Sequence, residues 1–132
     1  MFGIISVIVT IIMFAQSSNY SALSALDDLC GETIKTEVKS PSGRYVATIF
    51  ERDCGATTDF ATIVSLRKAE EVFDAKGAKG QQPVLIVSGQ PAVTLSWSSD
   101  TDLVVTLPPT EAFTKRESWR DVRIVYQQDY LR

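Results

Sequence analysis

Residues 31–39 alternate hydrophobic and polar side chains, and a turn motif, Ser40-Pro41-Ser42-Gly43, separates them from the hydrophobic residues 45–50. Pro has the fixed φ that the start of a type I turn needs, and Gly readily adopts the left-handed position that follows. The pattern therefore predicts a β-hairpin in which Ser40 lies opposite Arg44 and Val38 lies opposite Val46. One face of its first strand carries Lys and Glu side chains and is expected to face water.

The same register, extended to the ends of the hairpin, places Cys30 opposite Cys54. These are the two cysteines of the chain, and paired cysteines are typical of exported proteins. Closing a loop of about 25 residues should stabilise the fold by about 3 kcal/mol. We therefore predict a disulfide between Cys30 and Cys54, and the alternative is a free, reactive Cys54 beside Arg52.

The rest of the chain carries further short strand patterns, separated mostly by turn residues. They begin at Phe60, Pro83, Ala92, Asp102 and Trp119. The second strand of the hairpin, residues 45–52, is hydrophobic on both faces and is expected to be central and covered twice. Residues 69–82 and 108–118 are polar and are predicted to be loops. The pattern predicts an all-β fold, an antiparallel meander of about seven short strands in a small sandwich or a strongly twisted sheet.

The N-terminal residues 2–15 form an uncharged hydrophobic run. Its length is typical of a signal-peptide core and shorter than a membrane span of roughly 20 residues. Small residues in Ala15-Gln16-Ser17 fit a cleavage site, so we predict a signal peptide at 1–17, a linker at 18–29 and a single β domain at 30–132. No Lys or Arg precedes the run, which leaves an uncleaved inner-membrane anchor as the alternative. Either case predicts a periplasmic or extracytoplasmic domain, with membrane contact only through residues 2–15.

Composition narrows the classes of function. The 132 residues suffice for one small domain, and 45% of them are hydrophobic. The net charge of −3 gives no basic patch, which argues against nucleic acid as a partner. The chain has no histidine, and histidine is the commonest neutral-pH general base and a frequent zinc ligand. We therefore predict no cofactor, no metal site and no catalytic residue.

The most distinctive polar segment is the loop that leaves the hairpin, Cys54-Gly55-Ala56-Thr57-Thr58-Asp59. Its charges and hydroxyls favour binding over catalysis because no base is at hand to activate a nucleophile. The candidate binding residues there are Arg52, Asp53, Thr57, Thr58 and Asp59. A loop with only a structural role, held by the disulfide, is the alternative.

Trp119 is a second candidate for binding. Its neighbours Ser118, Arg120 and Asp121 are polar, which predicts an exposed aromatic anchor. Asp53 and Asp59 form the single carboxylate pair that would suit a hydrolase.

Two motifs resemble known proteins. Ser-Pro-x-Gly-x-Tyr from Ser40 and Cys-Gly-Ala-Thr-Thr from Cys54 resemble motifs shared by a group of small bacterial envelope proteins. This resemblance implies export, and it implies no activity or functional residue. The segments at Ser40 and Ser96 are also similar to the corners of β-propeller repeats, although about 115 residues are too few for an ordinary propeller.

From these observations we expect an exported, non-enzymatic β-domain protein that binds another envelope component, either a protein or a glycan. A periplasmic inhibitor or immunity protein is the first alternative. A carboxylate-dependent hydrolase is the second.

Overall fold

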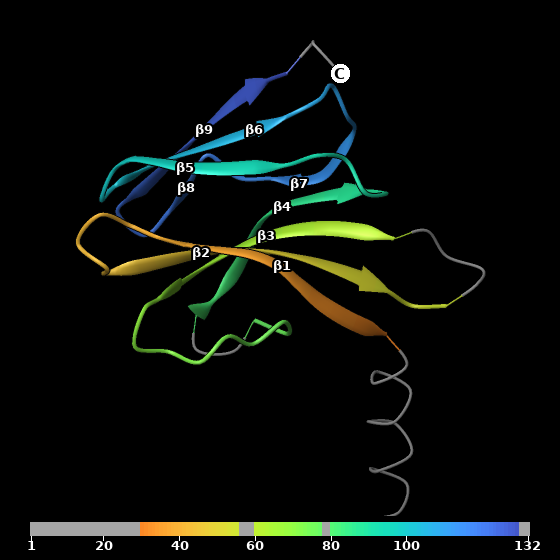
Figure 1. The fold of residues 1–132 in the computed structure, drawn as a ribbon, viewed down its shortest axis with the longest axis horizontal. Helices are drawn as coiled ribbons and strands as arrows, with labels where there is room; N and C mark the ends of the chain where they lie inside the picture. The colour runs from red at the N-terminus through yellow and green to blue at the C-terminus, as the bar shows by residue number, and fades with distance from the viewer. Residues whose placement is uncertain (1–29, 56–59, 78–79, 130–132) are drawn as a thin grey trace, which may run out of the picture. The chain divides into compact units, whose positions relative to one another are not determined.

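The computed structural model describes residues 30–55, 60–77 and 80–129 (Figure 1). Within these residues the chain forms nine β-strands in two sheets and no α-helix. The first sheet has the strand order β1 (Gly31–Lys39), β2 (Tyr45–Asp53), β3 (Ala61–Lys68), β4 (Gln82–Ser88) and β7 (Ala112–Lys115). The second sheet has the order β5 (Thr94–Ser99), β6 (Asp102–Leu107), β9 (Val122–Gln128) and β8 (Ser118–Trp119).

The all-β prediction is confirmed, but the prediction of about seven strands is wrong. The polar segment 108–118 was expected to be a loop, but it contains all of β7 and the first residue of β8. Strand β7 forms by pairing with β4, with Leu85 opposite Lys115, while its one large hydrophobic side chain, Phe113, is 76% exposed. A strand held by backbone pairing alone leaves no buried face and hence no pattern in the sequence.

The predicted meander holds only for the first half of the chain. Neighbours from β2 to β4 pair antiparallel, and β5 and β6 form the predicted antiparallel hairpin. Strand β9, however, runs parallel to β6, with Leu103 opposite Ile124. The chain reaches this position by crossing to the first sheet as β7 and returning as β8. A purely antiparallel meander is therefore wrong, because the connection from β6 to β9 passes through the other sheet.

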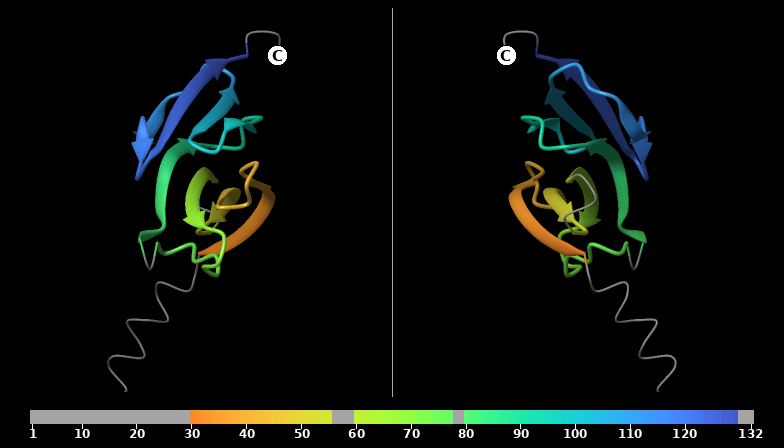
Figure 2. Two further views of the ribbon diagram at one scale, coloured as in Figure 1. Left: turned by 90° about the vertical axis from the view of Figure 1, so that its left-hand side faces the viewer. Right: turned by 90° about the vertical axis from the view of Figure 1, so that its right-hand side faces the viewer.

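The two sheets share one hydrophobic core, which makes the fold a sandwich; Figure 2 shows the second sheet, whose strands run from teal (β5) to dark blue (β9), over the first. Every second residue of β6 enters this core, as the alternation predicts. The core is formed by Tyr45, Ala47, Ile49, Val64, Leu66, Val84, Leu85, Val87, Leu103, Val105, Leu107, Trp119, Val122 and Ile124.

Strand β2 is buried on both faces from Tyr45 to Phe50, as predicted. One face enters the core between the sheets. On the other face, the Phe50 ring contacts the Phe73 ring edge-on at 5.1 Å. Gln81 is 2% exposed, and its side-chain amide donates to the Val72 carbonyl. Part of segment 69–82, predicted to be a solvated loop, therefore covers this face of the sheet.

The hairpin loop is one residue longer than predicted. The amide of Gly43 donates to the Ser40 carbonyl at 2.8 Å, and φ of Gly43 is 78°. The amide of Ser40 donates to the carbonyl of Tyr45 at 2.9 Å, so Ser40 pairs with Tyr45 and not with Arg44. The Ser40 hydroxyl accepts the Tyr45 amide at 3.1 Å. This side-chain acceptor closes the wider loop.

The predicted disulfide is confirmed, because both Cys30 and Cys54 are disulfide-bonded and the chain has no other cysteine. No helix in the described ranges has the length and hydrophobicity of a membrane span. The hydrophobic run 2–15, its cleavage site and the linker lie outside these ranges.

Candidate functional site

The candidate residues beside the disulfide have structural contacts. The Arg52 guanidinium donates to the Ala75 carbonyl at 3.2 Å and lies 3.6 Å from the Glu32 carboxylate. The Asp53 carboxylate accepts the amide of Gly55 at 3.1 Å. These contacts hold the end of the hairpin and the turn that follows it.

The other candidates of this loop, Thr57, Thr58 and Asp59, lie outside the described residues. The structure therefore does not place the Asp53 and Asp59 carboxylates relative to each other, nor does it bring the five candidates of the loop together as one site.

The expectation that Trp119 is an exposed anchor is wrong. Its side chain is 4% exposed and belongs to the core. The indole nitrogen donates to the Gly80 carbonyl at 3.2 Å, and the ring packs edge-on against Tyr45 at 5.4 Å. Its neighbours are polar because β8 is a two-residue edge strand, in which Trp119 points inward while Ser118 points outward.

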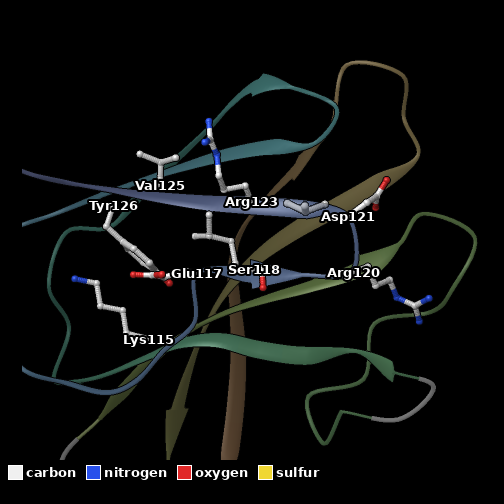
Figure 3. A pocket seen from close by; sticks show the side chains of 10 residues that line it. Lys115, Glu117, Ser118, Arg120, Asp121, Arg123, Val125 and Tyr126 are labelled. Atoms are coloured by element: carbon white, nitrogen blue, oxygen red, sulfur yellow. The ribbon is translucent and has the colours of Figure 1, made fainter.

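A groove of about 760 Å³ lies beside β8 and β9 (Figure 3). Its walls come from the end of β7, the connection to β8, the turn after β8, and β9. The lining residues are Lys115, Glu117, Ser118, Arg120, Asp121, Val122, Arg123, Ile124, Val125 and Tyr126.

The groove exists because β8 is much shorter than β9. Only two residue pairs join these strands, Ser118 with Arg123 and Trp119 with Val122. One further backbone hydrogen bond joins the Ile124 amide to the Glu117 carbonyl. Beyond that point the chain bends away toward β7, whereas β9 continues to Gln128. In the described part of the chain, no strand lies along this last stretch of the β9 edge.

Tyr126 forms the wall at one end of the groove. Its hydroxyl bonds to the Arg116 carbonyl at 2.7 Å and the Val84 carbonyl at 3.2 Å. The Lys115 ammonium lies 4.7 Å from the centre of its ring. Burial, followed by the charge of Glu117, raises the pKa of Tyr126 to about 12. This phenol is therefore neutral at ordinary pH, and its hydroxyl is occupied by the protein's own backbone.

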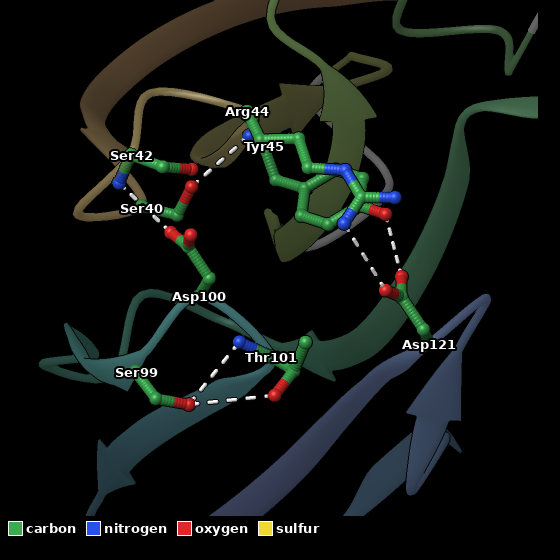
Figure 4. Close-up of polar contacts among 8 residues, drawn as sticks. All are labelled: Ser40, Ser42, Arg44, Tyr45, Ser99, Asp100, Thr101 and Asp121. Atoms are coloured by element: carbon green, nitrogen blue, oxygen red, sulfur yellow. Dashed lines mark hydrogen bonds and ion pairs between the residues drawn. The ribbon is translucent and has the colours of Figure 1, made fainter.

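Asp121 marks the other end of the groove (Figure 3), and its polar contacts are drawn in Figure 4. Its carboxylate accepts the Tyr45 hydroxyl at 2.5 Å and lies 3.4 Å from the Arg44 guanidinium. The hydrogen bond from Tyr45 is the main cause that lowers the pKa of Asp121, and the same bond raises the pKa of Tyr45. Asp121 is thus ionised and already engaged by the first sheet.

A second contact joins the two turns at this end of the sandwich. The amide of Ser42 donates to the Asp100 carboxylate at 2.8 Å. Hydrogen bonds from Ser42 are the main cause that lowers the pKa of Asp100. The hairpin loop is therefore tied to the β5–β6 turn as well as to Asp121.

The remaining charges make the groove cationic. Arg123 is bonded to Asp102 at 3.1 Å, but its side chain is 73% exposed. The Arg120 guanidinium lies 5.1 Å from the Trp119 ring centre. The lining holds three cations, Lys115, Arg120 and Arg123, and two acids, Glu117 and Asp121. Asp121 is paired with Arg44 and Arg123 with Asp102, which leaves a local excess of one positive charge. This local excess contrasts with the net charge of −3 of the whole chain.

The geometry of the groove suits binding. It combines the edge of a β-strand with cationic side chains, which are elements of peptide recognition. Among the described residues, no three His, Cys, Asp or Glu side chains lie close enough together to hold a metal ion.

The groove was not predicted from the sequence, because the residues from Trp119 onward were expected to form one continuous strand. The signal that could have found it is the polar pair Arg120-Asp121 inside the strand pattern. Arg120 has a φ of 53°, a conformation typical of turns, and it separates β8 from β9.

In comparisons with known proteins, the chain matches no family model, no curated protein and no solved structure. The resemblance to bacterial envelope proteins therefore stays a prediction from two motifs.

Proposed function

We propose that this protein is an exported, non-enzymatic binding module that uses the groove beside β9 to bind another protein of the bacterial envelope. The observation that carries the proposal is the open end of β9, where a strand edge and cationic side chains border one groove. Exposed strand edges readily pair with other chains, and folds usually cover or blunt them. An edge left open next to a groove is therefore a candidate interface.

A protein partner suits this groove better than a glycan does. Glycan binding uses exposed aromatic faces. Trp119 is buried, and the ring of Tyr126 is packed against the core and covered by Lys115. What the groove offers is charge and strand backbone, which recognise polypeptide.

Export is supported by the disulfide between Cys30 and Cys54, since disulfides persist in oxidising compartments. The hydrophobic run at 2–15 and the resemblance to envelope proteins point the same way. An extracytoplasmic location, with or without an anchor, is part of the proposal.

The proposal can be tested by site-specific photo-crosslinking in a bacterium that exports the full chain. Benzoylphenylalanine replaces Ser118 in the groove or, as a control, the exposed Lys39 at the far edge of the first sheet. We expect a discrete protein adduct from position 118 and none from position 39. The adduct should weaken when Lys115→Glu is added and persist with Lys39→Glu. No adduct at position 118, or one that Lys115→Glu leaves unchanged, would contradict the use of the groove.

A further inference from the structure

The open edge of β9 presents backbone groups in a known direction. The amides of Arg123 and Asp129 donate to carbonyls of Thr101 and Leu107, on the β6 side. The amide of Ile124 donates to the Glu117 carbonyl, on the opposite side. Successive residues of a strand direct their backbone groups to alternate edges. The amide and carbonyl of Tyr126, two residues beyond Ile124, therefore face the groove.

The groove leaves this edge available in the described part of the chain. The pairing of β8 with β9 ends at the bond between Glu117 and Ile124. A strand placed beside Tyr126 would continue the line of β8 and extend the second sheet at its edge. Such an addition gives main-chain hydrogen bonds, and side-chain pockets on alternate positions provide the selectivity.

The charges beside the edge favour an acidic strand. Arg123 projects on the outer face of the sheet, and Lys115 lies at the ring of Tyr126 on the other side (Figure 3). A strand added at this edge would thus meet Lys115 on one face and Arg123, which is itself bonded to Asp102, on the other, while the Glu117 carboxylate also lines the groove. Carboxylates on that strand would pair with these cations, whereas a basic strand would be repelled.

We propose that the partner contributes an extended acidic segment, which adds a strand to the edge of β9 in the groove. This inference rests on the proposed function and specifies the partner's chemistry. The Tyr126 backbone supplies the hydrogen bonds, and Lys115 and Arg123 select the acidic side chains.

The test uses the full chain, labelled with ¹⁵N and held in detergent micelles with its disulfide intact. The probe is a synthetic peptide of the sequence Thr-Glu-Glu-Val-Thr-Glu-Glu-Thr, which carries Glu on both faces of an extended strand. Amide hydrogen exchange is followed by NMR with and without the peptide. When the peptide occupies nine-tenths of the protein, hydrogen exchange of the Tyr126 amide should slow by about tenfold. The reason is that this amide then exchanges only in the remaining tenth of the molecules, which have no peptide bound. Exchange at Ile124 should stay unchanged, since its amide is already bonded within the fold.

Two control peptides separate backbone pairing from charge. One replaces alternate residues with proline and so loses the amides that a strand needs, and the other replaces each Glu with Lys. Neither should protect Tyr126. Lys115→Glu should lower the affinity for the acidic peptide by at least about fivefold, whereas Lys39→Glu should leave it unchanged.

Several results would overturn the inference. The first is that the acidic peptide does not protect the Tyr126 amide from exchange, and the second is that the proline peptide protects it equally well. The third is that the Tyr126 amide is protected without any peptide and loses this protection when the protein is diluted. The last result would assign the edge to a second copy of this chain. If the photo-crosslinks at position 118 form while Tyr126 stays unprotected, the proposed function stands and strand addition fails. If the crosslinks are absent too, both fail.

Discussion

Replacing Trp119 by alanine should destabilise the domain strongly, because this side chain lies in the core and not on the surface. The indole is 4% exposed, and it packs against Tyr45 and donates to the Gly80 carbonyl. Removing a buried Trp side chain costs about 3–5 kcal/mol from the lost transfer energy and the cavity that remains. The whole domain is expected to be stable by only about 5–15 kcal/mol. The loss is therefore a large fraction of the total.

A second substitution, Trp119→Phe, divides this loss into its parts. Phenylalanine keeps most of the packing and removes the donor to Gly80, so we expect a cost of about 1–2 kcal/mol. Phe113→Ala is the matched control, because that aromatic side chain is 76% exposed and should change stability by no more than about 0.5 kcal/mol.

The assay is urea unfolding followed by circular dichroism, with the free energy of unfolding obtained by linear extrapolation. The expected order of cost is Trp119→Ala, then Trp119→Phe, then Phe113→Ala. A Trp119→Ala variant that is no less stable than Phe113→Ala would refute the burial of Trp119, and with it the placement of β8 that creates the groove.

Three further predictions concern the covalent and ionisable groups. Replacing both Cys30 and Cys54 by serine should lower the free energy of unfolding by about 3 kcal/mol, measured by the same urea assay, and an unchanged midpoint would contradict this role. The lowered pKa of Asp121 means that its contribution to stability is present above about pH 3.8 and is lost as the pH falls through the lower folded-state pKa. Asp121→Asn should therefore reduce the loss of stability measured by acid titration, and an unaltered acid profile would argue against the contact with Tyr45. The pKa of Tyr126, raised from 10.0 to about 12, predicts stability that is lost as the pH rises through this range. In Tyr126→Phe this alkaline loss should be smaller, and phenolate absorbance should lack its latest-titrating component.

The features that the sequence predicted are those with a local cause. The turn motif at Ser40 and the alternation in the strand before it specify the first hairpin, because a two-residue period and a turn need only neighbouring residues. The double burial of β2 follows from hydrophobic residues on both of its faces. The disulfide followed from the hairpin even though the loop is one residue longer than expected, since it required only that Cys30 and Cys54 come near the ends of the paired strands.

The features that the sequence did not predict depend on distant parts of the chain. A strand pattern is the same for a parallel and an antiparallel neighbour, so nothing in residues 122–128 indicates that β9 runs parallel to β6. Strand β7 buries no large side chain, and its pairing with β4 leaves no hydrophobic period. Trp119 was predicted to be exposed because its neighbours in the sequence are polar. In a strand of two residues such as β8, one side chain points inward and the next outward, so polar neighbours do not indicate that a residue is exposed.

The first hairpin also accounts for where the groove lies. Tyr45 begins β2, and its hydroxyl holds Asp121, the residue immediately before β9. The preceding residue, Arg120, takes up a φ of 53°, which costs a non-glycine residue about 1 kcal/mol or more and persists only where surrounding contacts impose it. Packing of Trp119 on one side and the Asp121 contact on the other supply that constraint. Together they fix the tight turn that ends β8, and β8 has only two residues because the chain arrives from β7 of the other sheet just before it, at Glu117. The hairpin thereby fixes where β9 begins, and the late arrival of the chain at β8 leaves the far half of the β9 edge without a neighbouring strand among the described residues, which is the feature on which the proposed binding depends.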